Sequence, residues 1–542
     1  MKTVKVLTCF LALLFTDWGM AQSKENTEGR GVLFSTDVII HNKPSENQRS
    51  LRMASAFNGW LYVANTINDT SNQRGGIYVS FSKDNGATWT KFVTYVFNNS
   101  FYALTDIVVT GTDTSHLDVF LAGVYKSFPS LNNTLYMDKF DGRNGTLTTG
   151  QVFVRAVGLE RVTDISLASD YLYPMSGMAP YSVGLLYTVS GGLKDSLLFS
   201  ESTDGGNTFS VNQLISTTNG AYRKVSLAYG RSIGISGSYY AAWELMSSAL
   251  SKLGHIYTSH TANKSSNNWF NPICLDSLSN STLNLVCNPS IACQINNGLN
   301  DSANLTSLIT FERAAGGNIH NMNVVGFYNK RASVGNIWNA FNVAATAEND
   351  KEPSSTFDPA ENSFLLTYYD STNGRLPYCV KALNMDSPSS WTMITPQYND
   401  QTGNLKDASP HILMNPVLHT PGFAWIAENQ GTKNGVILFD AFSAGLATGI
   451  QMHASAENKI ALPYPNPASE FLLVPVSLEL PDDVLVSVFD ILGNEVGSEQ
   501  VWHLAAGTEN VSVALNHYPG GVYFCHIQAG SMSRTMRFVV SR

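Results

Sequence analysis

A strand-like phrase recurs along most of the chain with a period of about sixty residues, and this repeat restricts the fold more than any other feature. Its two best copies are IYVSFSKDNGATWTKF, from Ile77, and LLFSESTDGGNTFSVNQ, from Leu197. Weaker copies begin at Leu135, His255, Val324, Tyr378 and Gly435. Two more strand-like runs precede each copy, as in NPSIACQI followed by SLITFE. Each repeat is therefore predicted to form a four-stranded meander.

A single four-stranded sheet of this kind cannot cover both of its faces, so the repeats are expected to pack face to face around an axis. About 420 residues, over residues 30–451, divided by about sixty give seven repeats, with six as the alternative. The early run GVLFSTDVII is expected to supply the outer strand of the last repeat and so remove the exposed edges. The predicted fold class is all-β, with a β-propeller as its main domain.

Composition agrees with this class and excludes several functions. Charged residues make up only 14% of the chain and aromatic residues 11%, which suits short strands better than long amphipathic helices. The net charge of -9 comes without any basic run, so no nucleic-acid partner is expected. No zinc-protease, serine-hydrolase or phosphate-loop motif is present, so we expect no cofactor and no metal site. The histidines, such as His255, His260 and His320, are interpreted as surface or turn residues.

The first 21 residues have the form of a secretory signal peptide. Two early lysines precede an apolar stretch from Val6 to Phe15, and cleavage is expected after Ala21. No later segment reaches the ~18–20 apolar residues that cross a bilayer, so no transmembrane segment is predicted. Five cysteines remain after cleavage, among which one disulfide, Cys274 with Cys287 or Cys293, is considered.

The two best copies share the pattern Ser-x-Asp-x-Gly-x-Thr-aromatic on the hairpin between the third and fourth strands of a repeat. Glycine permits the positive φ of the turn, aspartate and serine can bind its amides, and the aromatic residue can pack beneath it. A catalytic site would need these residue types only once, so a structural role is predicted. The residues are Ser82, Asp84, Gly86, Thr88 and Trp89 in the first copy, and Ser202, Asp204, Gly206, Thr208 and Phe209 in the second.

This pattern resembles the Asp-box, or bacterial neuraminidase repeat, and the region resembles the sialidase-like propeller superfamily. The resemblance implies that ligands bind where the innermost strand of a repeat begins and its second strand ends. Candidates for ligand binding at these points are Arg52, Arg161, Arg223, Glu244, Glu312, Asp370 and Glu428. Guanidinium groups and carboxylates could grip a sugar or an acidic ligand, or they could pair with one another around a central channel.

Sialidase catalysis would require three arginines, a Tyr–Glu nucleophile pair and an aspartate acid/base. Arg52, in the sequence Arg-Met-Ala, is the nearest match to the family's Arg-Ile-Pro, and no other catalytic residue is assigned. The first hypothesis is therefore a non-catalytic module that binds an extracellular glycan or protein ligand. The alternatives are a glycoside hydrolase of sialidase-like type and a purely structural surface component.

The repeat stops near residue 450, where a polar linker over 452–462 precedes a different domain, 463–542. Its alternating segments, such as VLVSVFDILGNEV and GGVYFCHIQ, predict a small Ig-like β-sandwich. This domain begins with the phrase Tyr464-Pro465-Asn466-Pro467 and ends with MRFVVSR. Both phrases resemble the type A C-terminal sorting domain of the type IX secretion system. The resemblance implies a Bacteroidota protein that meets the type IX machinery and is secreted or held at the cell surface.

Overall fold

In a computed structural model the chain divides into two compact units, Met1–Leu446 and Ala447–Arg542. The structure describes residues 34–442 and 459–541 with gaps, mostly in the connections. The gaps are 35–36, 42–46, 70–73, 112–116, 128–132, 159, 171–181, 192–193, 211, 233–234, 249–250, 252, 263–267, 277–284, 296–304, 315–321, 333–334, 345–348, 360–361, 383–390, 396, 401–407, 429–434, 461–462, 464–467, 470, 479–481, 492–493, 505–506 and 530–531. The expected signal peptide, most of the linker and Tyr464, Pro465, Asn466 and Pro467 lie outside the described residues.

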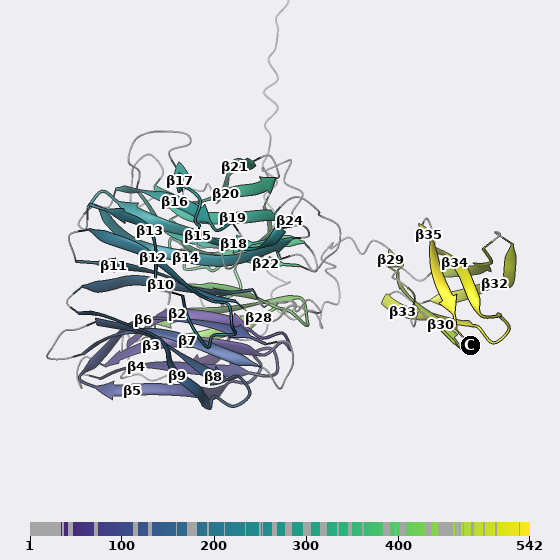
Figure 1. Cartoon of the computed structure of the whole chain (residues 1–542), viewed down its shortest axis with the longest axis horizontal. Coiled ribbons are helices and arrows are strands. Elements are labelled where there is room, and N and C mark those ends of the chain that lie inside the picture. The colour runs from purple at the N-terminus through teal and green to yellow at the C-terminus, as the bar shows by residue number, and fades with distance from the viewer. Residues whose placement is uncertain are drawn as a thin grey trace, which may run out of the picture. The chain divides into compact units, whose positions relative to one another are not determined.

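The described part of the first unit contains seven four-stranded antiparallel sheets (Figure 1). The first four are β2 (Asn47–Ser55), β3 (Leu61–Asp69), β4 (Arg74–Ser82) and β5 (Thr90–Asn98); β6 (Ser100–Thr110), β7 (Asp118–Ser127), β8 (Asn133–Asp141) and β9 (Leu147–Gly158); β10 (Arg161–Ser169), β11 (Val183–Ser190), β12 (Asp195–Ser202) and β13 (Gln213–Thr218); β14 (Ala221–Ser232), β15 (Ile235–Met246), β16 (Gly254–His260) and β17 (Ile273–Cys274). The other three are β18 (Val286–Cys293), β19 (Leu305–Ala314), β20 (Met322–Ala332) and β21 (Gly335–Ala344); β22 (Asp350–Asp358), β23 (Ser363–Asp370), β24 (Tyr378–Ala382) and β25 (Thr392–Thr395); β26 (His411–Asn415), β27 (Thr420–Glu428), β28 (Gly435–Ala441) and β1 (Val38–His41).

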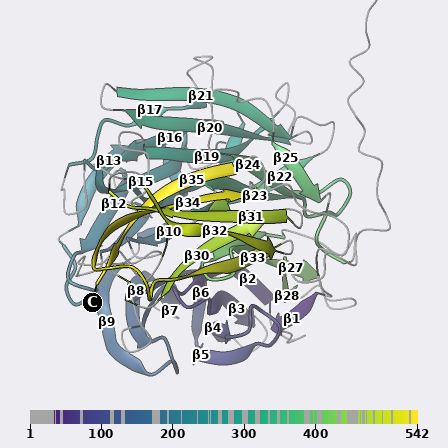
Figure 2. The ribbon, with the colours of Figure 1, turned by 90° about the vertical axis from the view of Figure 1, so that its right-hand side faces the viewer.

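The sheets follow one another in chain order around an axis, and the last lies beside the first (Figures 1 and 2). The first strand of each sheet contacts the first strand of the next, and β26 of the last sheet contacts β2. The N-terminal strand β1 pairs with β28, with Val38 opposite Phe439, so the last sheet takes one strand from the start of the chain. This closed ring of sheets confirms the predicted propeller and the role expected for GVLFSTDVII.

Apolar side chains from neighbouring sheets fill the space between them. One cluster joins Ala64 and Val79 of the first sheet to Ile107 and Val119 of the second, and all four side chains are buried. Burial of a large aliphatic side chain contributes roughly 1.5–3 kcal/mol, so these contacts are what hold adjacent sheets face to face. The cores therefore lie between sheets, which leaves the first strands free to line the axis.

The second unit consists of two antiparallel sheets with one core between them. One sheet has the order β29 (Lys459–Ile460), β30 (Phe471–Leu478) and β33 (Gly507–Ala514), and the other β32 (Glu495–Leu504), β31 (Asp482–Phe489), β34 (Gly521–Ala529) and β35 (Met532–Val540). Leu472, Val486, Val511 and Phe538 are among the buried residues that the two sheets share. The expected small β-sandwich is therefore confirmed. Among all described residues, no helix has the length and apolar character needed to span a membrane.

Candidate ligand-binding site in the central cavity

The two Ser-x-Asp-x-Gly-x-Thr turns join β4 to β5 and β12 to β13, and both have the same hydrogen-bond pattern. In the first, Ser82 Oγ donates to Asp84 Oδ1 at 2.7 Å and accepts from Gly86 N at 2.8 Å. Thr88 N donates to Asp84 Oδ1 at 2.9 Å, and Thr88 Oγ1 donates to Asp84 Oδ2 at 2.5 Å. Trp89 packs edge-on against Phe439, with ring centroids 5.0 Å apart. These contacts lie within the turn and its packing.

The second turn repeats this geometry. Ser202 Oγ lies 2.8 Å from both Asp204 Oδ1 and Gly206 N, and Thr208 Oγ1 donates to Asp204 Oδ2 at 2.6 Å. Phe209 packs against Phe153 at 5.8 Å. Burial acts to raise the pKa of the Asp204 carboxyl, but the hydrogen bonds from threonine and serine outweigh it and lower that pKa. A carboxylate held ionised and fully occupied by its own turn is suited to bracing a loop.

A cavity of about 350 Å³ lies on the axis of the propeller. Its wall consists of residues from all seven first strands or the residues just before them. The charged or ionisable residues on this wall are Arg52, Asp106, Asp164, Lys224, Glu352 and His411, and the neutral polar ones are Asn288, Ser166, Ser226, Ser290, Ser354, Ser355 and Ser409. The cavity is therefore lined by both hydrogen-bond donors and acceptors.

A belt of hydrogen bonds joins each first strand to the next. Ser166 Oγ accepts from Leu227 N at 3.0 Å, and the same bond is made by Ser226, Ser290 and Ser354 to the amides of the strands that follow them. Asp106 occupies this position in the second sheet, where its Oδ2 accepts from Leu167 N at 2.7 Å. The residues at this position, in chain order, are Arg52, Asp106, Ser166, Ser226, Ser290, Ser354 and His411.

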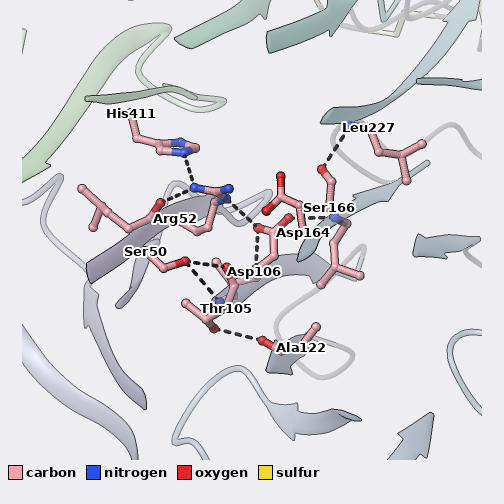
Figure 3. A network of polar contacts seen from close by, with 12 residues as sticks. Ser50, Arg52, Thr105, Asp106, Ala122, Asp164, Ser166, Leu227 and His411 are labelled. Atoms are coloured by element: carbon pink, nitrogen blue, oxygen red, sulfur yellow. Dashed lines mark hydrogen bonds and ion pairs between the residues drawn. The ribbon is translucent and has the colours of Figure 1, made fainter. Parts of the chain in front are cut away.

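Three neighbouring positions of this belt break the serine pattern. His411, Arg52 and Asp106 come from the last, first and second sheets and lie side by side in Figure 3. Arg52 Nη1 lies 3.4 Å from His411 Nε2, and Arg52 Nε lies 3.8 Å from Asp106 Oδ1. Since a guanidinium group has only donors, His411 Nε2 must accept, and its proton is then on Nδ1. The repeat thus places a neutral imidazole, a cation and a carboxyl where a structural belt needs only serine.

The environment shifts the protonation of two of these groups. Burial raises the pKa of Asp106 to about 6, although the Arg52 guanidinium and the amides of Leu167 and Ile107 act to lower it. Burial, followed by the charge of Arg52, lowers the pKa of His411 to about 3. Asp106 can therefore exchange a proton near neutral pH, whereas His411 stays uncharged there.

A second level of polar groups lies two residues before the belt. Asp164 Oδ2 accepts from Val225 N at 2.9 Å, and Glu352 Oε2 accepts from Ser409 N at 2.6 Å. Asp164 Oδ1 is buried and makes no hydrogen bond to any described residue. Ser50, Asn288, Glu352 and Ser409 share positive φ at this level, between 41° and 52°. For the first three residues this is the position of a bulge in the strand. Such bulges redirect side chains next to functional sites.

Glu244 and Glu312 lie at matching points near the ends of β15 and β19, where they bind the bulge of the following sheet. Glu244 Oε1 accepts from Asn288 N at 2.5 Å, and Glu312 Oε1 accepts from Glu352 N at 2.8 Å. Both side chains are buried, and burial raises the pKa of Glu244 to about 7. These two carboxyl groups brace the cavity wall from behind, and neither lines the cavity.

The equivalence expected for four carboxylates holds for Glu244 and Glu312 and is wrong for Asp370. In the pairing of β22 with β23, Tyr369 takes the place that Glu312 has in β19, so Asp370 lies one residue further on. Its Oδ2 binds Arg375 Nη2 at 2.9 Å, and its Oδ1 accepts from the turn amide of Thr372. The backbone of Glu428 pairs with Gly435, two residues past the matching point, and its side chain is outside the described residues.

The three candidate arginines also separate in space. Arg52 lines the central cavity, whereas Arg161 is exposed at the start of β10 and does not. Arg223 Nη2 donates to Ser251 O at 2.7 Å and lines a different hollow, of about 390 Å³, together with Glu312. The structure thus does not bring the three arginines together around one cavity.

Sequence reasoning missed Asp106, Asp164 and His411. The letters Thr-Asp-Ile occur at both aspartates, but the hydrogen bonds show that Asp106 matches Ser166, so the two motifs are displaced by two residues. An alignment of the seven first strands identifies Asp106, Asp164 and His411 as cavity residues only when the pairing register of each strand is known. The disulfide considered for Cys274 is not formed, because none of Cys274, Cys287 and Cys293 is joined to another described cysteine.

Comparison with known proteins assigns the second unit. Residues 463–541 match the family described as the secretion system C-terminal sorting domain. No curated protein matches the sequence. Among solved structures, an α-L-arabinofuranosidase from Fusarium graminearum has 11% identity and a TM-score of 0.42, covering 76% of this chain and 99% of that one.

Two further structures have similar scores. An α-L-arabinanase from Penicillium chrysogenum has 12% identity and a TM-score of 0.39 over 75% of this chain and 98% of its own. A fucose-specific lectin from Aleuria aurantia has 10% identity and a TM-score of 0.34 over 66% of this chain and 98% of its own. At these values none of the three structures indicates a ligand for this chain. The C-terminal unit is a secretion-system sorting domain, which directs the chain through type IX secretion to the cell surface or the extracellular space.

Proposed function

We propose that the exported propeller is a non-catalytic module that binds an extracellular glycan in its central cavity. The observation that carries this proposal is the break in the serine belt, where His411, Arg52 and Asp106 face the axis together. A wall that served only to join strands could repeat serine at all seven positions. The volume of about 350 Å³ is in the ~300–1,000 Å³ range of small-molecule sites.

The chemistry of the wall fits a ligand rich in hydroxyl groups. Arg52 and Lys224 carry donor groups, while Asp164 and Glu352 carry acceptor oxygens, and all four residues line the same wall. A saccharide hydroxyl donates one hydrogen bond and accepts others, so it can use both kinds of group at once. A protein partner would instead need a broad surface, which an axial cavity of this volume does not offer.

The non-catalytic assignment rests on what the carboxylates already do. Both oxygens of Asp106 accept backbone amides, those of Ile107 and Leu167. Asp164 Oδ2 and Glu352 Oε2 are likewise bound to backbone amides of the next sheet. A general acid or nucleophile has to face its substrate, and these groups are oriented by the strands they join.

A glycoside hydrolase is the second candidate, because one observation favours it. Asp106, with its pKa raised to about 6, and Asp164, with an unbound Oδ1, line the same cavity (Figure 3). Most glycosidases use two carboxyl groups that differ in protonation state. The two candidates differ in one respect that can be measured, which is turnover.

The test uses the full exported chain on a glycan array and with a panel of fluorogenic glycosides. Binding that is lost in Arg52→Met and Asp164→Asn, with no hydrolysis, supports the proposed module. Arg143→Met is the matched control, since Arg143 pairs with Asp141 on an exposed turn outside the cavity. Hydrolysis that disappears in Asp164→Asn establishes the enzyme instead, and binding that survives both cavity variants refutes the central site.

A further inference from the structure

A histidine, a cysteine and an aspartate meet at the outer strand of the fourth sheet, and none of them lines the central cavity. His255 is on β16, Cys274 ends β17, and Asp276 lies two residues after Cys274. Their nitrogen, sulfur and oxygen atoms all lie within 4.8 Å of one another. No short sequence motif predicts a metal site here, because His255 and Asp276 are 21 residues apart.

Local pairing holds the three side chains in place. Cys274 lies opposite Tyr257 in the pairing of β17 with β16, and Leu275 N donates to Ile256 O at 2.8 Å. Asp276 Oδ1 accepts from Ile256 N at 2.9 Å, which fixes the buried carboxylate beside the strand. The cluster is therefore formed by backbone contacts and does not depend on mobile side chains alone.

The distances within the cluster are short. Asp276 Oδ2 lies 2.9 Å from His255 Nδ1, and Asp276 Oδ1 lies 3.5 Å from Cys274 Sγ. His255 and Cys274 are half-buried, so solvent can reach the cluster from one side. Ligand atoms bound to one tetrahedral metal ion are separated by about 3–4 Å, given metal–ligand bonds of ~2.0–2.3 Å. Small side-chain movements would bring all three donors to such distances.

We propose that His255, Cys274 and Asp276 bind a divalent transition-metal ion of the zinc type. Imidazole nitrogen, thiolate sulfur and carboxylate oxygen are the three ligand classes of protein zinc sites. Calcium and magnesium are excluded by the same set, because they require several oxygen ligands and the cluster offers one carboxylate. Three protein ligands leave a fourth position for water or an external ligand.

The absence of a disulfide at Cys274 is compatible with the proposal. The chain is exported, and the half-buried Cys274 is not joined to another cysteine. Outside the cell, a thiolate bound to a metal ion has a stable partner. Conversion of the thiol to the bound thiolate releases a proton. The other half-buried thiol, Cys287, contacts Glu312 Oε2 at 3.2 Å and has no histidine in its cluster, so it serves as the internal control.

The test is a titration of the full chain with Co²⁺ alone, a spectroscopic substitute for Zn²⁺. One equivalent should produce a near-ultraviolet sulfur-to-cobalt charge-transfer band, and Zn²⁺ should then remove it. Cys274→Ser should abolish this band, while Cys287→Ser should leave it intact. His255→Gln should weaken cobalt binding by at least about tenfold, as loss of a ligand or its support does.

Circular dichroism of each variant keeps loss of metal distinct from loss of fold. A folded Cys274→Ser protein that retains the band refutes the assignment of the thiolate. Absence of the band in the unsubstituted protein, with its thiols shown to be reduced, refutes the site itself. Asp276→Asn serves as a second variant, because the amide oxygen can still accept from Ile256 N while the negative charge is gone.

Discussion

Arg52 Nε lies 3.8 Å from Asp106 Oδ1, and this contact connects the first strand of one sheet to that of the next across the cavity wall. Burial raises the pKa of Asp106 and the guanidinium group of Arg52 acts against it, and the pKa that results is about 6. Arg52→Met should therefore raise the pKa of Asp106 above 6, because the burial remains and the opposing charge is gone. Carbon-detected NMR of the side-chain carboxyl group measures this titration directly.

The control for this prediction is Arg143→Met, which removes a guanidinium group that pairs with Asp141 rather than with Asp106. The pKa of Asp106 should stay near 6 in that variant. An unchanged pKa of Asp106 in Arg52→Met would show that the two groups do not interact in solution. Ligand binding by Arg52→Met then also tests whether the ligand needs the cation, because the carboxyl group of Asp106 is still present in that variant.

His411 should remain neutral across the physiological range. Burial and the Arg52 charge lower its pKa to about 3, and its Nε2 accepts from Arg52 Nη1. Its imidazole resonances should therefore show no titration between about pH 5 and pH 8, a range in which an ordinary histidine changes charge. Asp106, with a pKa of about 6, and Glu244, with a pKa of about 7, are the groups expected to titrate in that range instead. Titration of the His411 ring near pH 6.5 would contradict this picture.

Glu244 should make the protein less stable as the pH rises from about 4.5 to about 7. Burial raises its pKa from 4.5 to about 7 in the folded chain, so within this window the folded state holds a proton that the unfolded state has released. The free energy of unfolding then falls with pH and levels off above pH 7. Glu244→Gln keeps an oxygen that can accept from Asn288 N and removes this dependence.

At pH 8 the Glu244→Gln variant should exceed the unsubstituted protein in stability by up to about 3 kcal/mol, from ~1.4 kcal/mol per pKa unit of a buried group. At pH 4 this advantage should be absent, because the carboxyl group is then protonated in both states. Urea unfolding at the two pH values measures the difference. An equal effect at pH 4 and pH 8 would assign the change to packing rather than to charge.

The sequence predicted the fold well because the repeat, the alternation of apolar residues and the turn residues are all local signals. The four-stranded sheets and the contribution of β1 follow from such signals. The site could be predicted only in part. Arg52 does line the central cavity, but Asp370 lies one residue beyond the point in β23 that matches Glu312 in β19, and this offset is visible only in the pairing of strands. A shift of one residue moves a side chain to the other face of a sheet.

The belt shows the same limit more clearly. Asp106 and Asp164 occur in identical Thr-Asp-Ile phrases, yet one accepts an amide at the level of Ser166 and the other two residues earlier. Which level each side chain occupies depends on the bulges that precede it, between Tyr102 and Leu104 in β6 and between Val162 and Asp164 in β10. The positions of those bulges are defined by the pairing of strands, which a single sequence does not reveal.

The glycines of the second Ser-x-Asp-x-Gly-x-Thr turn provide a matched pair for testing its structural role. Gly205 and Gly206 have positive φ, 73° and 81°, so alanine is strained at both. A Cβ at Gly206 would lie 2.1 Å from Phe120 Cε1, in a buried ring, whereas a Cβ at Gly205 would meet nothing within 4 Å. The turn therefore presses one glycine against the core of the preceding sheet and leaves its neighbour open.

Gly205→Ala should lower the free energy of unfolding by about 1 kcal/mol, from backbone strain alone. Gly206→Ala should lower it by about 3 kcal/mol or more, since overpacking against Phe120 adds to the same strain. Chemical denaturation of the two variants measures both values. If the turn is structural, ligand binding by folded Gly206→Ala should match that of the unsubstituted protein. Equal losses of stability would contradict the close packing, and a folded variant that had lost binding would assign the turn a direct part in the site.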